Sequence, residues 1–378
     1  MTMLAMRARG FHALFVVLVA CGGNASTARP SSHPPVARPA PEDRYDFAAP
    51  PPLAPALVRV HLIDVGQGAA TLFELSCGAI LVDTGGEEDR LYHSGTSLHA
   101  YLEDFFRHRP DLNRTLAGLF ITHPHVDHAR NVKDVATSYT VENVVTDGRT
   151  SGSGGSEQAW LQTWATAHAK FFPVSSEEVP AGGLTNGTID PLACADVDPK
   201  ITVLWGAVPS RPPHWSAKTW DDENNHSVVV RVDVGKASFL VSGDLEVEGA
   251  HALIEKHRGT SALDVDVWEV SHHGSYNGTS PELVSALSPE IALLAVGPVE
   301  RELSWTAWDY GHPRKVTIEM LEGSIRRTRR PVRMDVATAA RGAFEPHDLT
   351  KAIYGTGWDG SVVITATTEG RYRVQTER

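Results

Sequence analysis

Three imidazoles and a carboxylate occur within one short segment of the sequence, as His123, His125, Asp127 and His128. On an extended segment, residues two apart project to the same side, so His123 and His125 can bind one metal ion. Pro124 fixes φ between them and favours that extended geometry. Asp127 and His128 come where the chain would turn into a helix, and they can face a second metal position. Imidazole nitrogen with carboxylate oxygen suits Zn²⁺, or Mn²⁺ as the alternative, so the segment predicts two divalent metal ions.

A centre with two metals needs further ligands, and two later strands end in suitable side chains. An apolar run at residues 237–242 is followed by Gly243 and Asp244, which places a carboxylate at the end of a strand, where it could bridge two metals. Another run ends in the pair His272 and His273. Adjacent side chains on a strand point to opposite faces. We therefore expect one of the two histidines to bind metal and the other to contact the substrate's oxyanion or to donate a proton.

The elements that position these side chains can be predicted from hydrophobic patterning. Apolar and β-branched runs predict strands at residues 58–65, 69–75, 79–83, 116–122, 201–205, 227–234, 237–242, 265–271, 291–296, 360–365 and 372–375. Helices are predicted at residues 97–107, 157–170, 246–257, 281–287 and 316–322. The stretch 145–222 is expected to be loop-rich around its one helix. Two blocks of strands with helices between them predict two sheets packed face to face, with helices outside.

The composition excludes some classes of function. The chain has 378 residues, 42 % of them hydrophobic and 21 % charged, which is ordinary for a globular protein with a buried core. Its formal charge of −12 predicts that the protein has no extended nucleic-acid-binding surface, because such surfaces carry basic side chains that neutralise phosphates. A nuclease remains compatible, since a pair of bound metals is itself a strong local positive charge. The oligomeric state cannot be predicted from these features.

The N-terminal residues predict export and anchoring to a membrane. Arg7 and Arg9 precede the apolar run 11–20, which is too short for a permanent membrane span. The run ends at Cys21 in a pattern that resembles a bacterial lipobox, which implies a signal peptide at residues 1–21 and lipidation of Cys21. A plain secretory signal is the alternative. The lipid anchor predicts an extracytoplasmic protein on a bacterial membrane, on the periplasmic side or at the cell surface.

Residues 22–56 are rich in proline, serine and alanine, and they predict an extended linker between the anchor and the domain. Three cysteines are too few for a disulfide framework or a thiolate metal cluster. If Cys21 is lipidated, Cys77 and Cys194 remain. They could form a disulfide or stay as two buried thiols, and both interpretations remain open.

The order of several motifs resembles the metallo-β-lactamase superfamily, and more specifically the soluble domain of ComEC-type competence proteins. Besides the histidine segment, the matching motifs are Asp64-Val65-Gly66-Gln67-Gly68, Asp83-Thr84-Gly85, Asn224-Asn225-His226-Ser227-Val228-Val229, Leu240-Val241-Ser242-Gly243-Asp244, His272-His273-Gly274-Ser275 and Tyr310-Gly311-His312-Pro313. The resemblance implies an α/β (α+β) fold, a four-layer αββα sandwich formed by residues 57–378 as a single catalytic domain. The metals would lie in a cleft at the sheet edges.

The resemblance also implies the roles of individual residues. The expected ligands are His123 and His125 for the first metal, Asp127, His128 and His272 for the second, and Asp244 between the two. Asp83 would orient the histidine loop. His226 falls where the superfamily places a third ligand for the first metal, with an ordinary surface histidine as the alternative.

The expected catalytic residues are Asp127, His273 and His312. Asp127 would orient the attacking water and accept its proton, and His273 or His312 would protonate the leaving group. His312 could also contact a phosphate, or it could only cap a loop. Two positions depart from the competence proteins: His125 and Ala69 stand where those proteins usually have an acidic residue.

The function predicted from these residues is metal-dependent hydrolysis of a phosphoester, as in a phosphodiesterase or nuclease, with a small-molecule or nucleotide substrate. Hydrolysis of an amide or lactone, including a β-lactam, is a second hypothesis. A third, from another class, is a non-catalytic, lipid-anchored accessory protein of DNA uptake or of the cell envelope.

Overall fold

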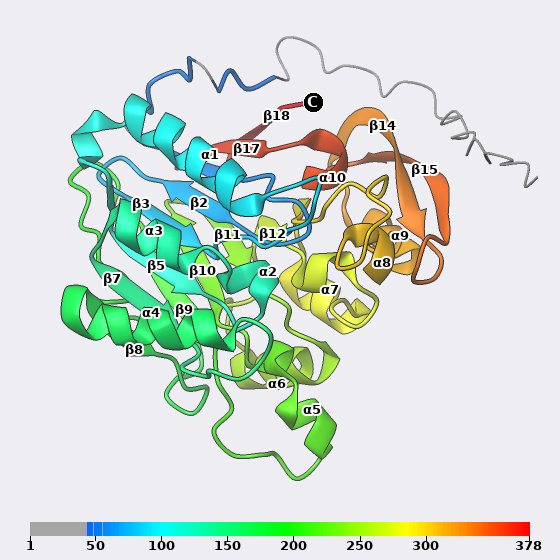
Figure 1. The fold of residues 1–378 in the computed structure, drawn as a ribbon, viewed down its shortest axis with the longest axis horizontal. Helices are drawn as coiled ribbons and strands as arrows, with labels where there is room; N and C mark the ends of the chain where they lie inside the picture. The colour runs from blue at the N-terminus through cyan, green and yellow to red at the C-terminus, as the bar shows by residue number, and fades with distance from the viewer. Residues whose placement is uncertain (1–43, 48, 55) are drawn as a thin grey trace, which may run out of the picture. The chain divides into compact units, whose positions relative to one another are not determined.

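Two β-sheets form the centre of the computed structural model, which describes residues 44–47, 49–54 and 56–378 (Figure 1). The first sheet has eight strands, in the order β18-β17-β1-β2-β3-β5-β7-β8, and the second has six, in the order β16-β13-β12-β11-β10-β9. The strands of the first sheet are β1 (Leu57–Leu62), β2 (Thr71–Glu74), β3 (Ala79–Val82), β5 (Gly118–Ile121), β7 (Asn143–Thr146), β8 (Lys170–Pro173), β17 (Val362–Thr367) and β18 (Tyr372–Thr376). Those of the second are β9 (Lys200–Trp205), β10 (Val229–Val234), β11 (Ala237–Val241), β12 (Val267–Glu269), β13 (Ile291–Leu294) and β16 (Ile353–Gly355).

The helices lie outside the two sheets (Figure 1). Those over the first sheet are α1 (Ser94–His108), α3 (Val132–Ser138) and α4 (Gly155–His168), and those over the second are α6 (Val247–His257), α7 (Pro281–Leu287) and α9 (Lys315–Ser324). Short helices occur in the connecting loops as α2 (Val126–Ala129), α5 (Ala217–Asp221), α8 (Ala307–Tyr310) and α10 (Thr356–Asp359). The predicted four-layer αββα sandwich is confirmed.

Alternating side chains on the strands explain the layers. In β2, Phe73 points into the core between the sheets, where its ring lies edge-on to Phe239 of β11 at 6.0 Å, whereas its neighbour Leu72 points toward the helices. In β3, Ile80 likewise points into the core between the sheets, and Leu81 points toward the helices. Because successive strand residues face opposite sides, a sheet that is apolar on both faces must be covered on both faces.

Parallel pairing brings several strand ends to one place. β3, β5, β7 and β8 run parallel in the first sheet, and β11, β12, β13 and β16 run parallel in the second. The carboxyl ends of parallel strands lie along the same edge of a sheet, so the loops that follow them are neighbours. The loops after β3, β5, β11 and β12 contain Asp83, the His123–His128 segment, Asp244 and the His272–His273 pair, and the connection after β13 contains His312.

Two parts of the fold were not predicted. The stretch expected to be loop-rich contains β8 and the second half of β7, which extend the first sheet. A separate hairpin of β14 (Thr328–Ala337) and β15 (Phe344–Lys351) was missed, because its sequence is charged and largely exposed and so lacks the apolar alternation of a strand.

A disulfide joins Cys77 and Cys194, with 5.3 Å between their Cα atoms. It links the turn between β2 and β3 to the long connection between β8 and β9, so of the two possibilities left open the structure has the disulfide. The predicted signal peptide with Cys21 lies outside the described residues, as does most of the predicted linker. Within the described ranges, no helix is both long and apolar enough to cross a membrane.

Candidate metal centre

The histidine loop begins where β5 ends. His123 and His125 lie in the short loop between Ile121 and α2, which starts at Val126, so Asp127 and His128 occupy the first turn of that helix. Close backbone contacts hold this loop. A Cβ atom on Gly86 would lie 2.0 Å from the Cα of Asp127, so only glycine fits there.

The loop after β11 approaches the histidine loop from the second sheet. Gly243 has a φ of +53°, and a Cβ atom on it would lie 2.8 Å from the Cβ of Thr122. Glycine therefore permits both the left-handed conformation and the close approach. As a result, Asp244 faces the histidines across the gap between the two sheets.

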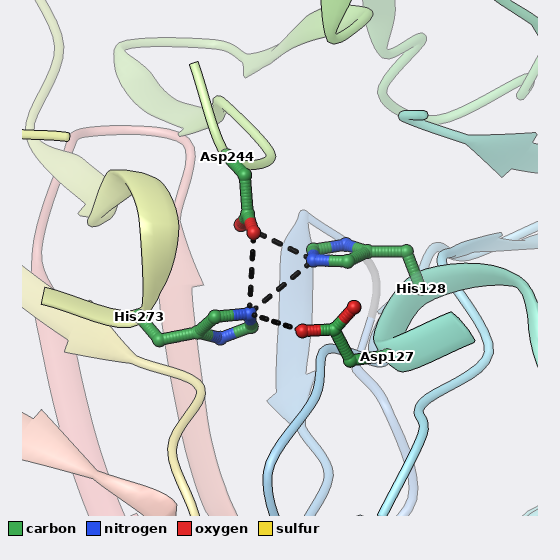
Figure 2. Close-up of side chains that lie close together, drawn as sticks. All are labelled: Asp127, His128, Asp244 and His273. Atoms are coloured by element: carbon green, nitrogen blue, oxygen red, sulfur yellow. Dashed lines mark hydrogen bonds and ion pairs between the residues drawn. The ribbon is translucent and has the colours of Figure 1, made fainter. Parts of the chain in front are cut away.

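Four buried or half-buried side chains converge on one point, as Figure 2 shows: Asp127, His128, Asp244 and His273. Each offers one ligand atom, and these atoms all lie within 4.8 Å of one another. Nε2 of His273 lies 3.2 Å from Oδ2 of Asp127 and 3.3 Å from Nε2 of His128, which in turn is 3.1 Å from Oδ1 of Asp244. Two nitrogens and two carboxylate oxygens around one point form a donor set that fits a divalent cation such as Zn²⁺ or Mn²⁺. We call these four residues the quartet.

A second pair of imidazoles adjoins the quartet. Nε2 of His123 lies 3.1 Å from Nδ1 of His125 and 3.9 Å from Oδ2 of Asp244. Asp244 therefore contacts members of both groups and lies between them. The residues that could hold one metal are His123 and His125, and those that could hold another are the quartet, with Asp244 shared.

Contacts behind the quartet orient its imidazoles. Nδ1 of His128 donates to Oδ2 of Asp83 at 2.7 Å, and Asp83 also accepts from the amide and the hydroxyl of Thr122, each at 2.8 Å. Nδ1 of His273 donates to the carbonyl oxygen of Ala295 at 2.5 Å. With the protons on Nδ1, the Nε2 lone pairs of both rings face the quartet, which is the tautomer that a metal ligand needs.

The pKa values show that this point attracts positive charge. Burial alone would lower the pKa of His273, but the carboxylates of Asp244 and Asp127 raise it to about 10. For His128 the effect of burial is likewise exceeded by Asp244 and Asp83, which raise its pKa well above the usual value. His123 is buried beside two other imidazoles, so its pKa is well below the usual value. A proton or a divalent cation can supply the positive charge that the carboxylates favour.

The structure differs from the expected roles of His272 and His273. His273 belongs to the quartet, whereas Nε2 of His272 is 3.9 Å from Asp244 and its Nδ1 is 3.5 Å from Glu246. The strand ends at Glu269, and residues 271–274 form a 3₁₀ turn in which both histidines have a φ of +53°. The alternation of side chains along a strand therefore does not apply to this pair. His273 belongs to the quartet, and Nε2 of His272 lies as far from Oδ2 of Asp244 as Nε2 of His123 does.

His226 is not in a position to bind metal. Its Nδ1 accepts from the amide of Val208 at 2.9 Å, and its Nε2 donates to the carbonyl oxygen of Trp220 at 2.7 Å. Both ring nitrogens are thus hydrogen-bonded to the backbone. His226 therefore holds the connection before β10 in place, and its nitrogens are not directed at the first metal position.

His312 lies next to the quartet and is held by a residue that was not predicted. Its ring stacks on that of His273 at 6.0 Å, and its Nδ1 accepts from Nε2 of Gln67 at 3.4 Å. The Oε1 atom of Gln67 accepts from the amide of Gly297, also at 3.4 Å, which fixes the orientation of the glutamine amide. His312 therefore carries its proton on Nε2 and can donate it. Only the position of Gln67 in the Asp64–Gly68 motif could have signalled this role.

Ala69, which stands where the competence proteins usually have an acidic residue, lies in the core of this protein. Ala69 is buried in the core between the sheets, its amide donates to the carbonyl oxygen of Asp127 at 2.9 Å, and its own carbonyl oxygen accepts from Gly85. Its backbone thus supports the histidine loop. The side chain is an apolar core contact.

Residues 63–297 match the family described as "Metallo-beta-lactamase superfamily". The match covers more than half of the chain, and the chain belongs to this superfamily, whose members are in general metal-dependent hydrolases.

Among curated proteins, ComE operon protein 3 of Bacillus subtilis is 27 % identical over 271 residues, which are 70 % of this chain and 30 % of that protein. Recombination protein 2 of Haemophilus influenzae is 24 % identical over 256 residues, 67 % of this chain and 25 % of that protein. The chain thus spans less than a third of the length of these relatives, and the predicted resemblance to competence proteins is confirmed. Among solved structures, the metallo-beta-lactamase fold protein YhfI of Bacillus subtilis is 14 % identical, with a TM-score of 0.35, over 63 % of this chain and 85 % of that one.

Proposed function

We propose that the chain is a metal-dependent phosphoesterase of the phosphodiesterase or nuclease type. The observation that carries the proposal is the quartet with its shared Asp244, which adjoins the His123–His125 pair and so offers ligands for two divalent cations. Bound cations would supply Lewis acidity toward phosphoryl oxygens and would make water a nucleophile at neutral pH.

Two side chains of the protein, Asp127 and His312, would orient the attacking water and protonate the leaving group. The side chain of Asp127 is 22 % exposed, in contrast to the other three members of the quartet, so its carboxylate can reach and orient a water molecule from the solvent side. Burial would raise the pKa of Asp127, but His273 and His128 lower it, so the group is ionised at neutral pH. His312, with its proton on Nε2, can donate to the leaving oxygen.

The resemblance to competence proteins supports a phosphoester over an amide or lactone. One relative is named a recombination protein and another, of Neisseria gonorrhoeae, a competence protein, and these names favour a phosphoester substrate over an amide or lactone. The net charge of −12 does not favour a long nucleic-acid track, so we propose a small or nucleotide-like phosphoester as substrate.

The test is turnover of bis(p-nitrophenyl) phosphate by protein loaded with Zn²⁺ or Mn²⁺. We expect hydrolysis that Asp127→Ala reduces by about 10²- to 10⁴-fold, the range for a residue that positions or transfers a proton. No turnover with either metal would refute the phosphoesterase. Hydrolysis of nitrocefin in its place would favour the amide or lactone hydrolase, and binding of less than one metal equivalent would favour a non-catalytic accessory protein.

We also propose that the protein works outside the cytoplasm, held to a bacterial membrane by lipidated Cys21. The Cys77–Cys194 disulfide supports this, because such bonds persist mainly in oxidising compartments. Cys21→Ser should remove metabolic labelling by palmitate and release the protein from the membrane fraction. Retention of the variant in that fraction would contradict the lipid anchor.

A further inference from the structure

Exposed aromatic side chains gather beside the metal centre. Among the described residues, the exposed large hydrophobic side chains are Leu91, Tyr276, Trp305, Tyr310 and Val316. Trp305 and Tyr310 lie shortly before His312 in the sequence, and Tyr276 lies shortly after His273. Their exposed fractions are 74 % for Trp305, 37 % for Tyr310 and 63 % for Tyr276. A tryptophan is usually well buried, so an exposed one that continues into a site indicates a binding surface.

A continuous series of rings connects this surface to the quartet. Trp305 lies edge-on to Tyr310 at 6.3 Å, Tyr310 stacks on His312 at 5.6 Å and 16°, and His312 stacks on His273 at 6.0 Å and 28°. A flat ring stacked on Tyr310 would therefore be separated from the ring of His273 by two rings, those of Tyr310 and His312, and a ring on Trp305 would be separated from it by three. The series thus joins the exposed aromatic side chains to a member of the quartet.

The loop holds Trp305 in an unusual conformation. Its φ is +66°, which is rare for a bulky side chain, and its amide donates to Oδ2 of Asp309 at 3.1 Å. The next residue, Thr306, is buried and donates to the carbonyl oxygens of Arg301 and Leu303. Such strained positions persist where the surrounding structure enforces them, and they are concentrated at functional sites. The backbone of Trp305 is thus held in place in advance of any ligand.

A cation adjoins the same surface. The guanidinium of Arg314 lies 5.5 Å from the ring centroid of Tyr276, and one of its nitrogens donates to the carbonyl oxygen of Tyr310. Its Nε is buried without a hydrogen-bond partner, and within the described ranges no carboxylate forms an ion pair with it. A positive charge without a carboxylate partner beside a phosphoesterase centre suits an anionic ligand.

We infer that Trp305 and Tyr310 form a base-stacking subsite, with Arg314 as the contact for a phosphate, and that the substrate is a phosphoester that carries an unpaired nucleobase. This inference rests on the proposed function and specifies its substrate class. Aromatic faces bind any base through stacking, whereas an aliphatic phosphoester gains nothing from them.

The experiment compares two ligands on the metal-loaded full-length protein by calorimetry: thymidine 5′-monophosphate and 2-deoxyribose 5-phosphate, which lacks the base. We expect the wild type to bind the nucleotide about 5- to 150-fold more tightly, the range that base stacking gives. Trp305→Leu should bring that ratio close to one, and Trp305→Phe should keep most of it. Arg314→Gln should weaken both ligands alike, and Leu91→Ala, an exposed hydrophobic control, should change neither.

Equal affinity of the wild type for the two ligands would overturn the inference, as would a ratio that Trp305→Leu leaves unchanged. Because binding is measured apart from turnover, the two proposals can fail separately. A base preference that depends on Trp305, in a protein without activity on bis(p-nitrophenyl) phosphate, would refute the phosphoesterase and leave the subsite standing.

Discussion

Two buried charged clusters in this protein differ in what completes them. Around Glu74, one carboxylate oxygen binds Arg59 at 3.0 Å and His61 at 3.3 Å, and the other binds Arg109 at 3.1 Å. The quartet around Asp244 consists only of histidines and aspartates whose ligand atoms face one another. Arginine is charged at any relevant pH, so the Glu74 cluster is complete by itself. An imidazole is charged only when protonated, so the quartet leaves a place for an added cation.

The difference shows how to distinguish a structural cluster from a functional one. A cavity of about 870 Å³ lies beside Glu74, yet both oxygens of that carboxylate already have protein partners. Burial and charge are therefore shared by both regions, and a nearby cavity does not make the Glu74 cluster a binding site. What separates them is that the lone pairs of the quartet converge without a fixed positive charge.

The largest expected effect is the loss of activity in Asp244→Asn. This carboxylate contacts both groups of candidate ligands, and charge stabilisation by a metal is worth several kcal/mol. We expect the rate of phosphodiester hydrolysis to fall by about 10³-fold or more, with the far-UV circular dichroism unchanged. A variant with more than a tenth of the wild-type rate would contradict the shared role of Asp244.

Glu74→Gln should affect stability. Removing the carboxylate leaves Arg59 and Arg109 buried without their partner, and breaking such pairs costs about 3–5 kcal/mol. Urea denaturation should show this loss, while metal content per folded molecule stays at the wild-type value. Reduced metal content in the folded fraction of Glu74→Gln would contradict the view that only the quartet, and not the Glu74 cluster, serves metal binding.

The pH dependence of stability should also reflect Glu74. Burial would raise its pKa, but His61, Arg59 and Arg109 lower it from 4.5 to about 2. A carboxyl with a depressed pKa in the folded state contributes stability above its unfolded pKa and loses that contribution as the pH falls toward its folded pKa. We expect unfolding free energy to fall between about pH 4.5 and pH 2, and this slope to be smaller in Glu74→Gln. Equal slopes in the two proteins would contradict the assignment.

Asp83→Asn should have a smaller effect on the quartet. Asp83 accepts from Nδ1 of His128, and loss of such an outer contact lowers metal affinity by about 10- to 100-fold. Competition with a chelator of known affinity measures this change. Arg109→Lys, at the other cluster, is the control and should leave the affinity unchanged, and an unaltered affinity in Asp83→Asn would show that His128 needs no orientation.

The sequence predicted those parts of the site whose position follows from local spacing. The His123–His128 segment and Asp244 could be placed because each follows a strand that the apolar pattern marks. The 3₁₀ turn at His272 and His273 could not be predicted, since its positive φ values come from tertiary contacts and not from the alternation of a strand. The same holds for His226, whose ring nitrogens are bonded to backbone groups of Val208 and Trp220. It also holds for Gln67, whose residue type alone indicates no chemistry.

The fold was predicted where strands are apolar and missed where they are polar. The core strands β1, β2, β3, β5 and β11 match their expected ranges because burial requires continuous apolar runs. The hairpin of β14 and β15 is charged and lies outside both sheets, so hydrophobic patterning could not reveal it.

Metal analysis of the purified protein by inductively coupled plasma mass spectrometry shows whether the quartet and the His123–His125 pair bind metal. We expect two equivalents of a divalent metal, Zn²⁺ or Mn²⁺, in the wild-type protein at neutral pH, and a loss of bound metal in Asp244→Asn. Less than one equivalent in the wild type, or equal metal content in the two proteins, would contradict the assignment of the quartet as a metal site.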